Sequence, residues 1–239
     1  MTFRATVDQH FPGTISQPAF VRRAAATLIQ DHGFTPTNSL ACVGVCRDEL
    51  CRSLTVEIET MWREPFDFSS LAGLLTLGRT GFAAARAHAP VVNGRARYLF
   101  FLFTHIGIGS EGEQGVVERP GLPEPDSACD ALVALLEELQ QRKQRVGRER
   151  RDPEQSLLRM RLRQMRGLSD APDLIELTKA VHHATVADLH SLMAEAFDRE
   201  NEDFAVVAGV QIHGPGVISL LWPGATYVVV EGRRSEIWF

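Results

Sequence analysis

A short apolar segment that ends abruptly in charged residues constrains this chain more than any other feature. Within Leu40–Arg52, valine and alanine alternate with small residues, a pattern that predicts a strand buried on both faces. A thiol, a guanidinium and two carboxylates follow it directly: Cys46, Arg47, Asp48 and Glu49. In open α/β sheets, ligand crevices form at the carboxyl ends of strands. We therefore expect this segment to form the floor of an active site.

The composition is that of a soluble globular chain. The 239 residues are 44% hydrophobic and 23% charged, and no apolar run is long enough to span a bilayer. The N-terminal residues lack the apolar core of a signal peptide, so we expect a cytoplasmic protein without a membrane partner. The net charge of −5 argues against general nucleic-acid binding, and the arginines of 142–166 are interleaved with acidic residues. Four cysteines are not a disulfide framework in so long a chain; they are expected to be buried, metal-bound or catalytic.

Helical and extended patterns alternate along the chain and favour one α/β domain over residues 1–239. Helices are predicted over Pro18–His32, Thr80–His88, Ala128–Gln141, Glu154–Met165 and Pro172–Phe197. Strands are predicted over Arg97–Phe103, Phe204–Ile212, Gly216–Leu221 and Tyr227–Glu231. The segment Ser53–Met61 alternates like a strand, and an irregular segment remains an alternative. We expect a central sheet, largely parallel or mixed, flanked by helices, with a helical insertion over about 142–200 that starts in a charged, flexible stretch, and a C-terminal β segment over 204–239.

Three candidate metal ligands stand at the ends of predicted elements. Cys46 ends the first core strand, His105 follows the strand Arg97–Phe103, and Cys129 lies in the first turn of the helix Ala128–Gln141. If the two strands are parallel neighbours, their ligands emerge at one edge of the sheet, and a helix starting above that edge brings Cys129 to them. Two thiolates and one imidazole are a zinc set with the fourth place left to water. Each residue alone also has an ordinary structural explanation, and no short metal motif marks them.

Motifs around these residues resemble those of one known family. The run CRDE, the run FLFTH that ends at His105 and the cysteine that opens a helix in RPGLPEPDSACDAL are similar to the limiting-CO2-inducible protein B family, which is related to β-class carbonic anhydrases. The stretch SSLAGLLTLGRTGFAAARAHAP extends the similarity. The resemblance implies a β-carbonic-anhydrase-like α/β fold, a zinc ion held by Cys46, His105 and Cys129, and a homodimer.

The resemblance also implies an activity and a second set of residues. The activity is the reversible hydration of CO2 to bicarbonate, in which zinc lowers the pKa of its bound water and supplies hydroxide. Asp48 is implied beside the metal, together with an arginine. The β-class enzymes carry Cys-x-Asp-x-Arg, but Leu50 stands at the arginine position here, so Arg52 or Arg47 has to take that role. An Asp48 drawn into such a pair leaves the metal open, whereas an Asp48 bound to zinc closes the site.

Three other hypotheses remain open. A catalytically silent zinc-binding homologue would act through a binding partner. A cysteine hydrolase would use Cys46 as nucleophile and His105 as base, oriented by a nearby carboxylate, but would leave Cys129 without a role. The run Gly107–Gly112 fits the GxGxxG fingerprint of a dinucleotide-dependent oxidoreductase, although the residues after it do not read as a helix.

Overall fold

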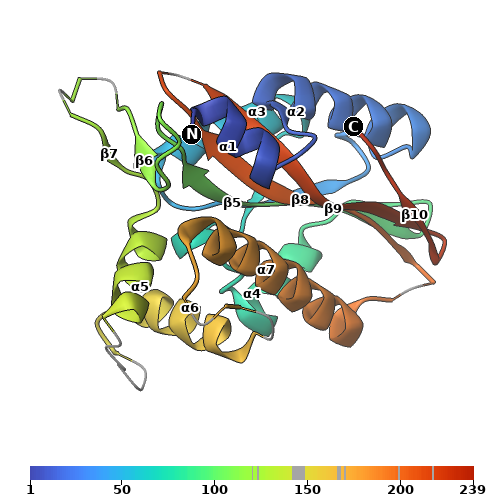
Figure 1. The fold of residues 1–239 in the computed structure, drawn as a ribbon. Helices are drawn as coiled ribbons and strands as arrows, with labels where there is room; N and C mark the ends of the chain where they lie inside the picture. Colours follow the sequence, from blue (N-terminus) through green and yellow to red (C-terminus); the bar gives the residue numbers. More distant parts are fainter. Residues whose placement is uncertain are drawn as a thin grey trace.

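The computed structural model is built around one mixed sheet with helices on both faces (Figure 1). It describes residues 1–119, 121–122, 124–141, 149–165, 168–169, 171–198, 200–216 and 218–239. The α-helices are α1 (Phe3–His10), α2 (Gln17–Ala26), α3 (Arg52–Met61), α4 (Gly78–Ala87), α5 (Asp130–Gln140), α6 (Pro153–Gln164) and α7 (Leu174–Ala196). The strands are β1 (Ile15–Ser16), β2 (Leu40–Gly44), β3 (Phe66–Asp67), β4 (Val91–Val92), β5 (Arg95–Gly107), β6 (Val116–Val117), β7 (Asp126–Ser127), β8 (Glu202–His213), β9 (Ser219–Val230) and β10 (Arg233–Glu236). Helices α1, α2 and α3 cover one face of the sheet, and α4, α5, α6 and α7 lie on the other.

The topology of the sheet brings the predicted active-site strand into its centre. The strand order is β1-β9-β8-β5-β2-β3, with β10 beside β9 and β4 beside β5. Strands β3, β2, β5 and β8 run parallel to one another, and β9 runs antiparallel to β8. The expected mixed α/β sheet flanked by helices is therefore confirmed. Strands β2 and β5 are direct parallel neighbours, with Leu40 opposite Tyr98 and Gly44 opposite Leu102, so their carboxyl ends reach the same edge.

Strand β5 is longer than its apolar pattern indicates. The sequence predicts that it ends at Phe103, but the strand continues through Thr104 and His105 to Gly107. The cause is β8, which pairs with β5 continuously from Ala96 to Gly107 and provides backbone partners beyond the apolar run. His105 therefore lies within the sheet and not in a loop after it.

The alternating segment Ser53–Met61 is neither a strand nor irregular, because it forms helix α3. The same pattern that suggests a strand places Leu54 and Ile58 four residues apart, which is one face of a helix. Both side chains are fully buried, whereas Val56 between them is 45% exposed. Period-two alternation over a short run is therefore compatible with either structure, and packing against the sheet decides for the helix.

The C-terminal β segment also differs in detail from the expected one. Two strands interrupted at Pro223-Gly224 are predicted, but β9 runs continuously through both. The register between β8 and β9 shifts between Val207 and Gly209, and Pro223 lies opposite Gly209 at this irregularity. A Cβ atom on Gly209 would lie 2.0 Å from the carbonyl oxygen of Trp222, so glycine permits the close approach. The proline thus sits where the ladder is already disturbed.

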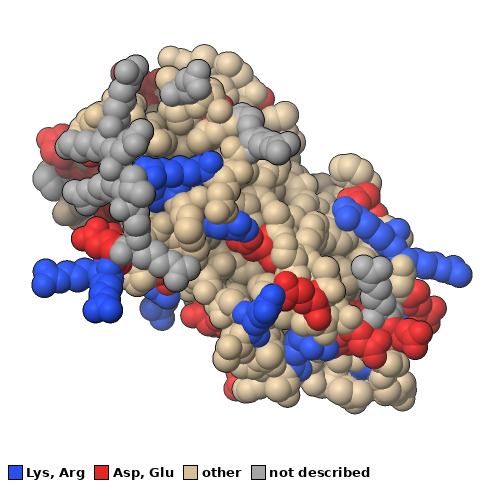
Figure 2. All heavy atoms as spheres, turned by 90° about the horizontal axis from the view of Figure 1, so that it is seen from below, with Lys and Arg blue, Asp and Glu red and all other residues tan. Residues whose placement is uncertain are grey.

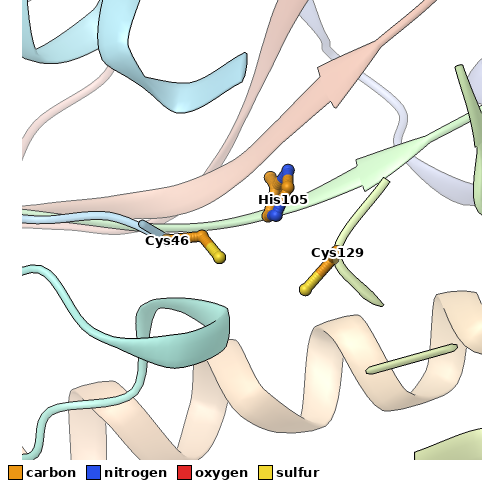
Figure 3. A group of neighbouring side chains, drawn as sticks. All are labelled: Cys46, His105 and Cys129. Carbon is orange, nitrogen blue, oxygen red and sulfur yellow. The ribbon is translucent and has the colours of Figure 1, made fainter. Parts of the chain in front are cut away.

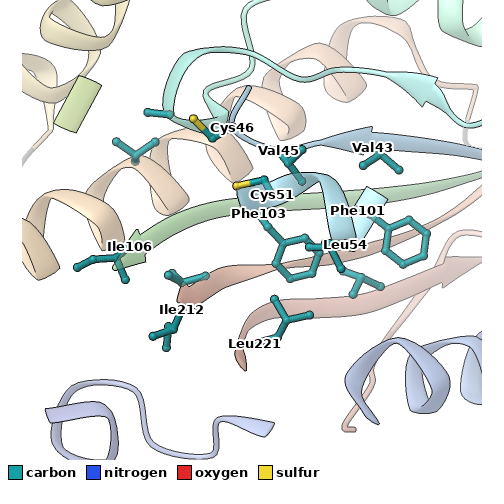
Figure 4. Close-up of a cluster of buried hydrophobic side chains, with 14 of the residues drawn as sticks. Val43, Val45, Cys46, Cys51, Leu54, Phe101, Phe103, Ile106, Ile212 and Leu221 are labelled. Carbon is teal, nitrogen blue, oxygen red and sulfur yellow. The ribbon is translucent and has the colours of Figure 1, made fainter. Parts of the chain in front are cut away.

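The core on the α2–α3 face is formed by β-branched, aromatic and aliphatic side chains of the central strands (Figure 4). Val43 and Val45 of the β2 segment, Phe101 and Phe103 of β5, and Leu54 of α3 meet there. Cys42 points to the other face and packs among Phe68, Phe100 and Phe82, as the alternation along β2 requires. Residues 142–148, the first part of the expected flexible stretch, lie outside the described residues.

Helices α6 and α7 account for the described part of the expected helical insertion. The face seen from below carries acidic and basic side chains side by side (Figure 2). Ion pairs join α7 to the neighbouring helices: Arg79 of α4 pairs with Glu195, and Arg161 of α6 pairs with Asp188. Among the described residues, no helix combines the length and the apolar character needed to cross a membrane.

Candidate metal centre

Cys46 lies directly beyond the end of β2, at a turn fixed by backbone contacts. It forms an isolated parallel bridge with Ser70, and the N–H of Arg47 donates to the Ser70 carbonyl oxygen at 3.2 Å. Gly73 packs against this turn with φ +73°, and a Cβ atom there would lie 2.6 Å from the carbonyl oxygen of Phe103. Glycine is required at such a position. The thiol is consequently held in one place, and Cys46 is only 5% exposed.

His105 is held by the central ladder, opposite Gln211 of β8. Its side chain is fully buried, and neither ring nitrogen has a hydrogen-bond partner among the described residues. A buried polar group left without a partner costs about 1–3 kcal/mol, so such groups are rare without a reason. An imidazole kept dry and unpaired beside two thiols has the surroundings expected of a metal ligand.

Cys129 is the residue that caps helix α5, one position before its first turn. It adopts the left-handed conformation, with φ 61° and ψ 63°, which is uncommon for a residue with a side chain. Its carbonyl oxygen accepts from the N–H of Leu132, and its own N–H donates to Asp48 Oδ2 at 3.3 Å. Figure 3 shows the Cys129 thiol on the same side of β5 as the Cys46 thiol.

The three predicted ligands come together. The sulfur atoms of Cys46 and Cys129 and a ring nitrogen of His105 all lie within 4.8 Å of one another (Figure 3). Ligands of a tetrahedral zinc ion lie about 3.5 Å apart, so small side-chain movements would complete the coordination. The Cys129 thiol and His105 lower the pKa of Cys46 to about 4 despite its burial, and the contact with Cys46 raises the pKa of Cys129. One thiolate is therefore already favoured, and a divalent cation would favour the second. The donor set fits zinc.

Asp48 is positioned beside these ligands by backbone donors. Its Oδ1 accepts from the N–H of Leu50 at 3.1 Å and its Oδ2 from the N–H of Cys129, while Oδ2 lies 3.9 Å from His105 Nε2. Although partial burial would raise the pKa of Asp48, these donors together with His105 and Arg119 hold it below its ordinary value. The carboxylate is thus both the cap of the following turn and a neighbour of the metal ligands.

The arginine beside Asp48 in the structure is Arg119. Its guanidinium lies 3.5 Å from Asp48 Oδ2, donates to the Ser127 carbonyl oxygen at 2.9 Å, and also pairs with Asp126 and Glu49. It therefore links Asp48 to the segment that carries Cys129. Sequence reasoning missed Arg119 because it lies 71 residues beyond Asp48 in a loop; its presence in the same motif as Cys129 was the available signal.

The two arginines expected from the sequence lie elsewhere. Arg47 pairs with Glu154 of α6 at 2.9 Å, and the same carboxylate accepts from the N–H of Leu71. Arg52 begins α3 with an exposed side chain. Arg47, Arg52 and Asp48 all line an open cavity of about 430 Å³, which Cys46 also borders and which has Val43 and Val45 in its wall. Of the three candidate ligands, Cys46 is in the lining of this cavity, and His105 and Cys129 are not.

The remaining cysteines are buried and differ in their surroundings. Burial raises the pKa values of Cys42 and Cys51. Cys42 lies among aromatic side chains, whereas Cys51, His105 and His213 form a second group whose possible ligand atoms lie within 4.8 Å of one another. Burial also lowers the pKa of His213 to about 3, so its ring is neutral.

The glycine-rich run after β5 does not form a dinucleotide site. Gly107 ends β5, and the chain then folds back: the N–H of Gly109 donates to Glu113, and the N–H of Gly115 donates to Gly107. The segment continues into β6 and not into a helix. The helix N-terminus that would bind a pyrophosphate is therefore missing at this place, so the interpretation of Gly107–Gly112 as a dinucleotide fingerprint is wrong.

The mixed sheet flanked by helices and the buried group of two cysteines and one histidine at its edge define an α/β protein with a candidate metal site. Residues 14–231 match the family of limiting CO2-inducible proteins B/C beta carbonic anhydrases, and the chain belongs to this family. It is similar to the crystal structure of limiting CO2-inducible protein LCIB, with 32% identity, a TM-score of 0.78 and 96% of each chain covered. The crystal structure of PtLCIB4, a homolog of LCIB, has the same fold, with 22% identity, a TM-score of 0.79, and 99% of this chain and 100% of that chain covered. The comparison with curated proteins found no match.

Proposed function

We propose that the protein is a zinc-dependent carbonic anhydrase that catalyses the reversible hydration of CO2 to bicarbonate. The observation that carries the proposal is the convergence of Cys46, His105 and Cys129, all buried and within 4.8 Å, in a chain of this family. Cys46 and Cys129 would bind the ion as thiolates and His105 through one ring nitrogen. When bound at such a site, zinc acts as a Lewis acid that lowers the pKa of a water molecule and makes it nucleophilic near neutral pH.

The protein's own residues would prepare the surroundings for this reaction. Asp48, held as a carboxylate by the N–H groups of Leu50 and Cys129, provides an acceptor next to the ligands and can orient a water molecule. Arg119 draws the same carboxylate toward the Cys129 segment, which keeps it from the coordination position of the metal.

The test is a stopped-flow CO2 hydration assay on protein whose zinc content is measured in the same sample. We expect about one zinc per chain and catalysed hydration. Cys129→Ser should lose zinc and activity, while the matched control Cys42→Ala, a buried cysteine in a separate cluster of aromatic side chains, should keep both. Zinc without hydration would support the silent homologue instead. Activity without zinc that depends on Cys46 and His105 but not on Cys129 would support the cysteine hydrolase.

We further propose a homodimer, on the basis of the family. The apolar segment Phe66–Leu77 gives little additional support, because Phe68, Leu74 and Leu75 are buried within the subunit. The large exposed apolar side chains lie elsewhere, at Val91 and Trp238 among others. Light scattering at micromolar concentration should report twice the mass of one chain; a monomer would reject this proposal.

A further inference from the structure

His105 has a second ring nitrogen, and the structure surrounds the ring with residues that the proposed zinc site does not use. Possible ligand atoms of Cys51 and His213 lie within 4.8 Å of one another and of a ring nitrogen of His105. All three residues are buried. Neither nitrogen of His105, nor Nε2 of His213, has a hydrogen-bond partner among the described residues. A second compact group therefore shares one imidazole with the first.

The second group lies on the face of the sheet that α2 and α3 cover. His105 lies two residues after Phe103 on β5, so the two side chains point to the same face of the sheet. Phe103 packs in the hydrophobic core of the α2–α3 face. His213 is in phase with Gln211 along β8, whose side chain donates to Gln17 of α2 at 2.8 Å. Cys51 immediately precedes α3.

The first group lies toward the opposite face. The sulfur atoms of Cys46 and Cys129 point toward α7 in Figure 3, and Figure 4 shows the Cys46 and Cys51 sulfur atoms on different sides of the end of β2. A ring nitrogen of His105 lies within 4.8 Å of the possible ligand atoms of each group. A metal ion bound by the two thiolates would occupy one ring nitrogen of His105 and leave the other in need of a partner.

A histidine bound to a metal needs a partner for the nitrogen that the metal leaves free. Such histidines almost always donate this second N–H to an acceptor, which fixes the tautomer and the ring orientation. Cys51 is the favoured acceptor, because its sulfur lies within 4.8 Å of a ring nitrogen of His105 and its position directly before α3 holds it there. The ring of His213 lies 5.3 Å from that of His105 at an angle of 78°, an edge-to-face packing contact.

We propose that Cys51 is a positioning residue for the metal centre, whose sulfur accepts the second N–H of His105 and fixes this ring for zinc binding. His213 packs against the ring and does not hold it. This inference rests on the proposed zinc site. It gives a buried cysteine outside the ligand set a defined role, and it distinguishes Cys51, which lies in a group with His105 and His213, from Cys42, which is equally buried among aromatic side chains.

The inference is tested by measuring the zinc affinity of folded protein in competition with a chromophoric chelator. Cys51→Ala should weaken zinc binding about 10–100-fold, as losses of such outer partners do. Cys51→Ser, which keeps an acceptor, should recover part of the affinity. Cys42→Ala and His213→Phe, which keeps the ring contact, should stay within about threefold of wild type. If Cys51→Ala does not fold, Cys51→Val fills the volume without an acceptor and replaces it.

Two results would overturn the inference while leaving the zinc site in place. One is a Cys51→Ala or Cys51→Val protein that binds zinc as tightly as Cys42→Ala. The other is a wild-type protein with two zinc ions per chain, one of which is lost in the Cys51 variants, because Cys51 would then be a ligand itself. A folded wild-type protein that binds no zinc would reject the proposed function and this inference together. With cobalt in place of zinc, the visible spectrum of Cys51→Ala should still show two thiolate ligands.

Discussion

Replacing Asp48 by alanine should separate its structural role from its role in catalysis. Three donors converge on this carboxylate: the N–H groups of Leu50 at 3.1 Å and Cys129 at 3.3 Å, and the guanidinium of Arg119 at 3.5 Å. Hydrogen bonds to a charged group contribute about 1.5–3 kcal/mol each to stability when they are made within the protein. Arg119 retains Asp126 and the Ser127 carbonyl oxygen as acceptors, so losing its contact with Asp48 should change the free energy of unfolding little.

The stability lost in Asp48→Ala should therefore come mainly from the two backbone hydrogen bonds to the carboxylate. Asp48→Ala should lower the free energy of unfolding by about 3–6 kcal/mol, and Asp48→Asn, which keeps one amide oxygen as an acceptor, by less. Both variants should retain zinc, because the three ligands do not include Asp48. Both should nevertheless lose about 10–100-fold in CO2 hydration, since each lacks the carboxylate that would orient the water molecule.

The assay combines urea unfolding of the zinc-loaded protein with stopped-flow hydration normalised to folded zinc sites. Asp48→Asn is the decisive variant, because its stability should be close to that of wild type while its rate is not. An unchanged rate per site in both variants would refute the reasoning. Asp48 would then be only the cap of the turn at Glu49–Cys51.

Three further predictions test other parts of the structure. Arg119→Ala should reduce CO2 hydration more than Arg52→Ala, because Arg119 is the arginine that contacts Asp48; equal rates in the two variants under stopped flow would count against the assignment. Leu54→Ala should cost about 2–5 kcal/mol in urea unfolding and Val56→Ala less than about 0.5 kcal/mol, because only the first is buried; similar losses would contradict helix α3. Burial would raise the pKa of Asp203, but Arg95 and the N–H of Glu231 hold it below its ordinary value. The charge of Asp203 therefore stabilises the fold above about pH 4, the pKa in the unfolded chain, and this contribution disappears as the pH falls through the lower native pKa. The stability difference between wild type and Asp203→Asn should therefore shrink on acidification below pH 4, and a constant difference would reject this role.

The candidate ligands could be found from the sequence because each stands where an element begins or ends. Two strands that end in polar residues and a helix that opens with a cysteine are visible in the one-dimensional pattern, and the parallel pairing of β2 and β5 converts that pattern into proximity. Arg119 could not be found in this way. It lies in a loop without periodicity, and its contact with Asp48 depends on how the segment before α5 returns to the sheet.

Two local assignments failed for a related reason, namely that tertiary packing decided between alternatives that the residues leave open. Leu54 and Ile58 satisfy both a strand and a helix pattern, and only the position of α3 on the sheet selects the helix. The polar residues Thr104 and His105 predict the end of a strand, but the neighbouring ladder of β8 extends it. The role proposed for Cys51 depends on the same extension, because it places His105 between two faces of the sheet.

The three candidate ligands are held with unequal firmness, and this has a consequence for how a bound metal ion would leave the protein. His105 lies in a ladder of consecutive backbone pairs at the centre of the sheet, whereas Cys129 caps a helix in a left-handed conformation and is tied to the sheet edge through Asp48. Local opening starts where protecting hydrogen bonds are fewest. We therefore expect amide hydrogens around Cys129–Leu132 to exchange faster with solvent once the metal is removed, while those of β5 stay protected. Release and uptake of the ion would then follow the fraying of one helix end, with the sheet unchanged.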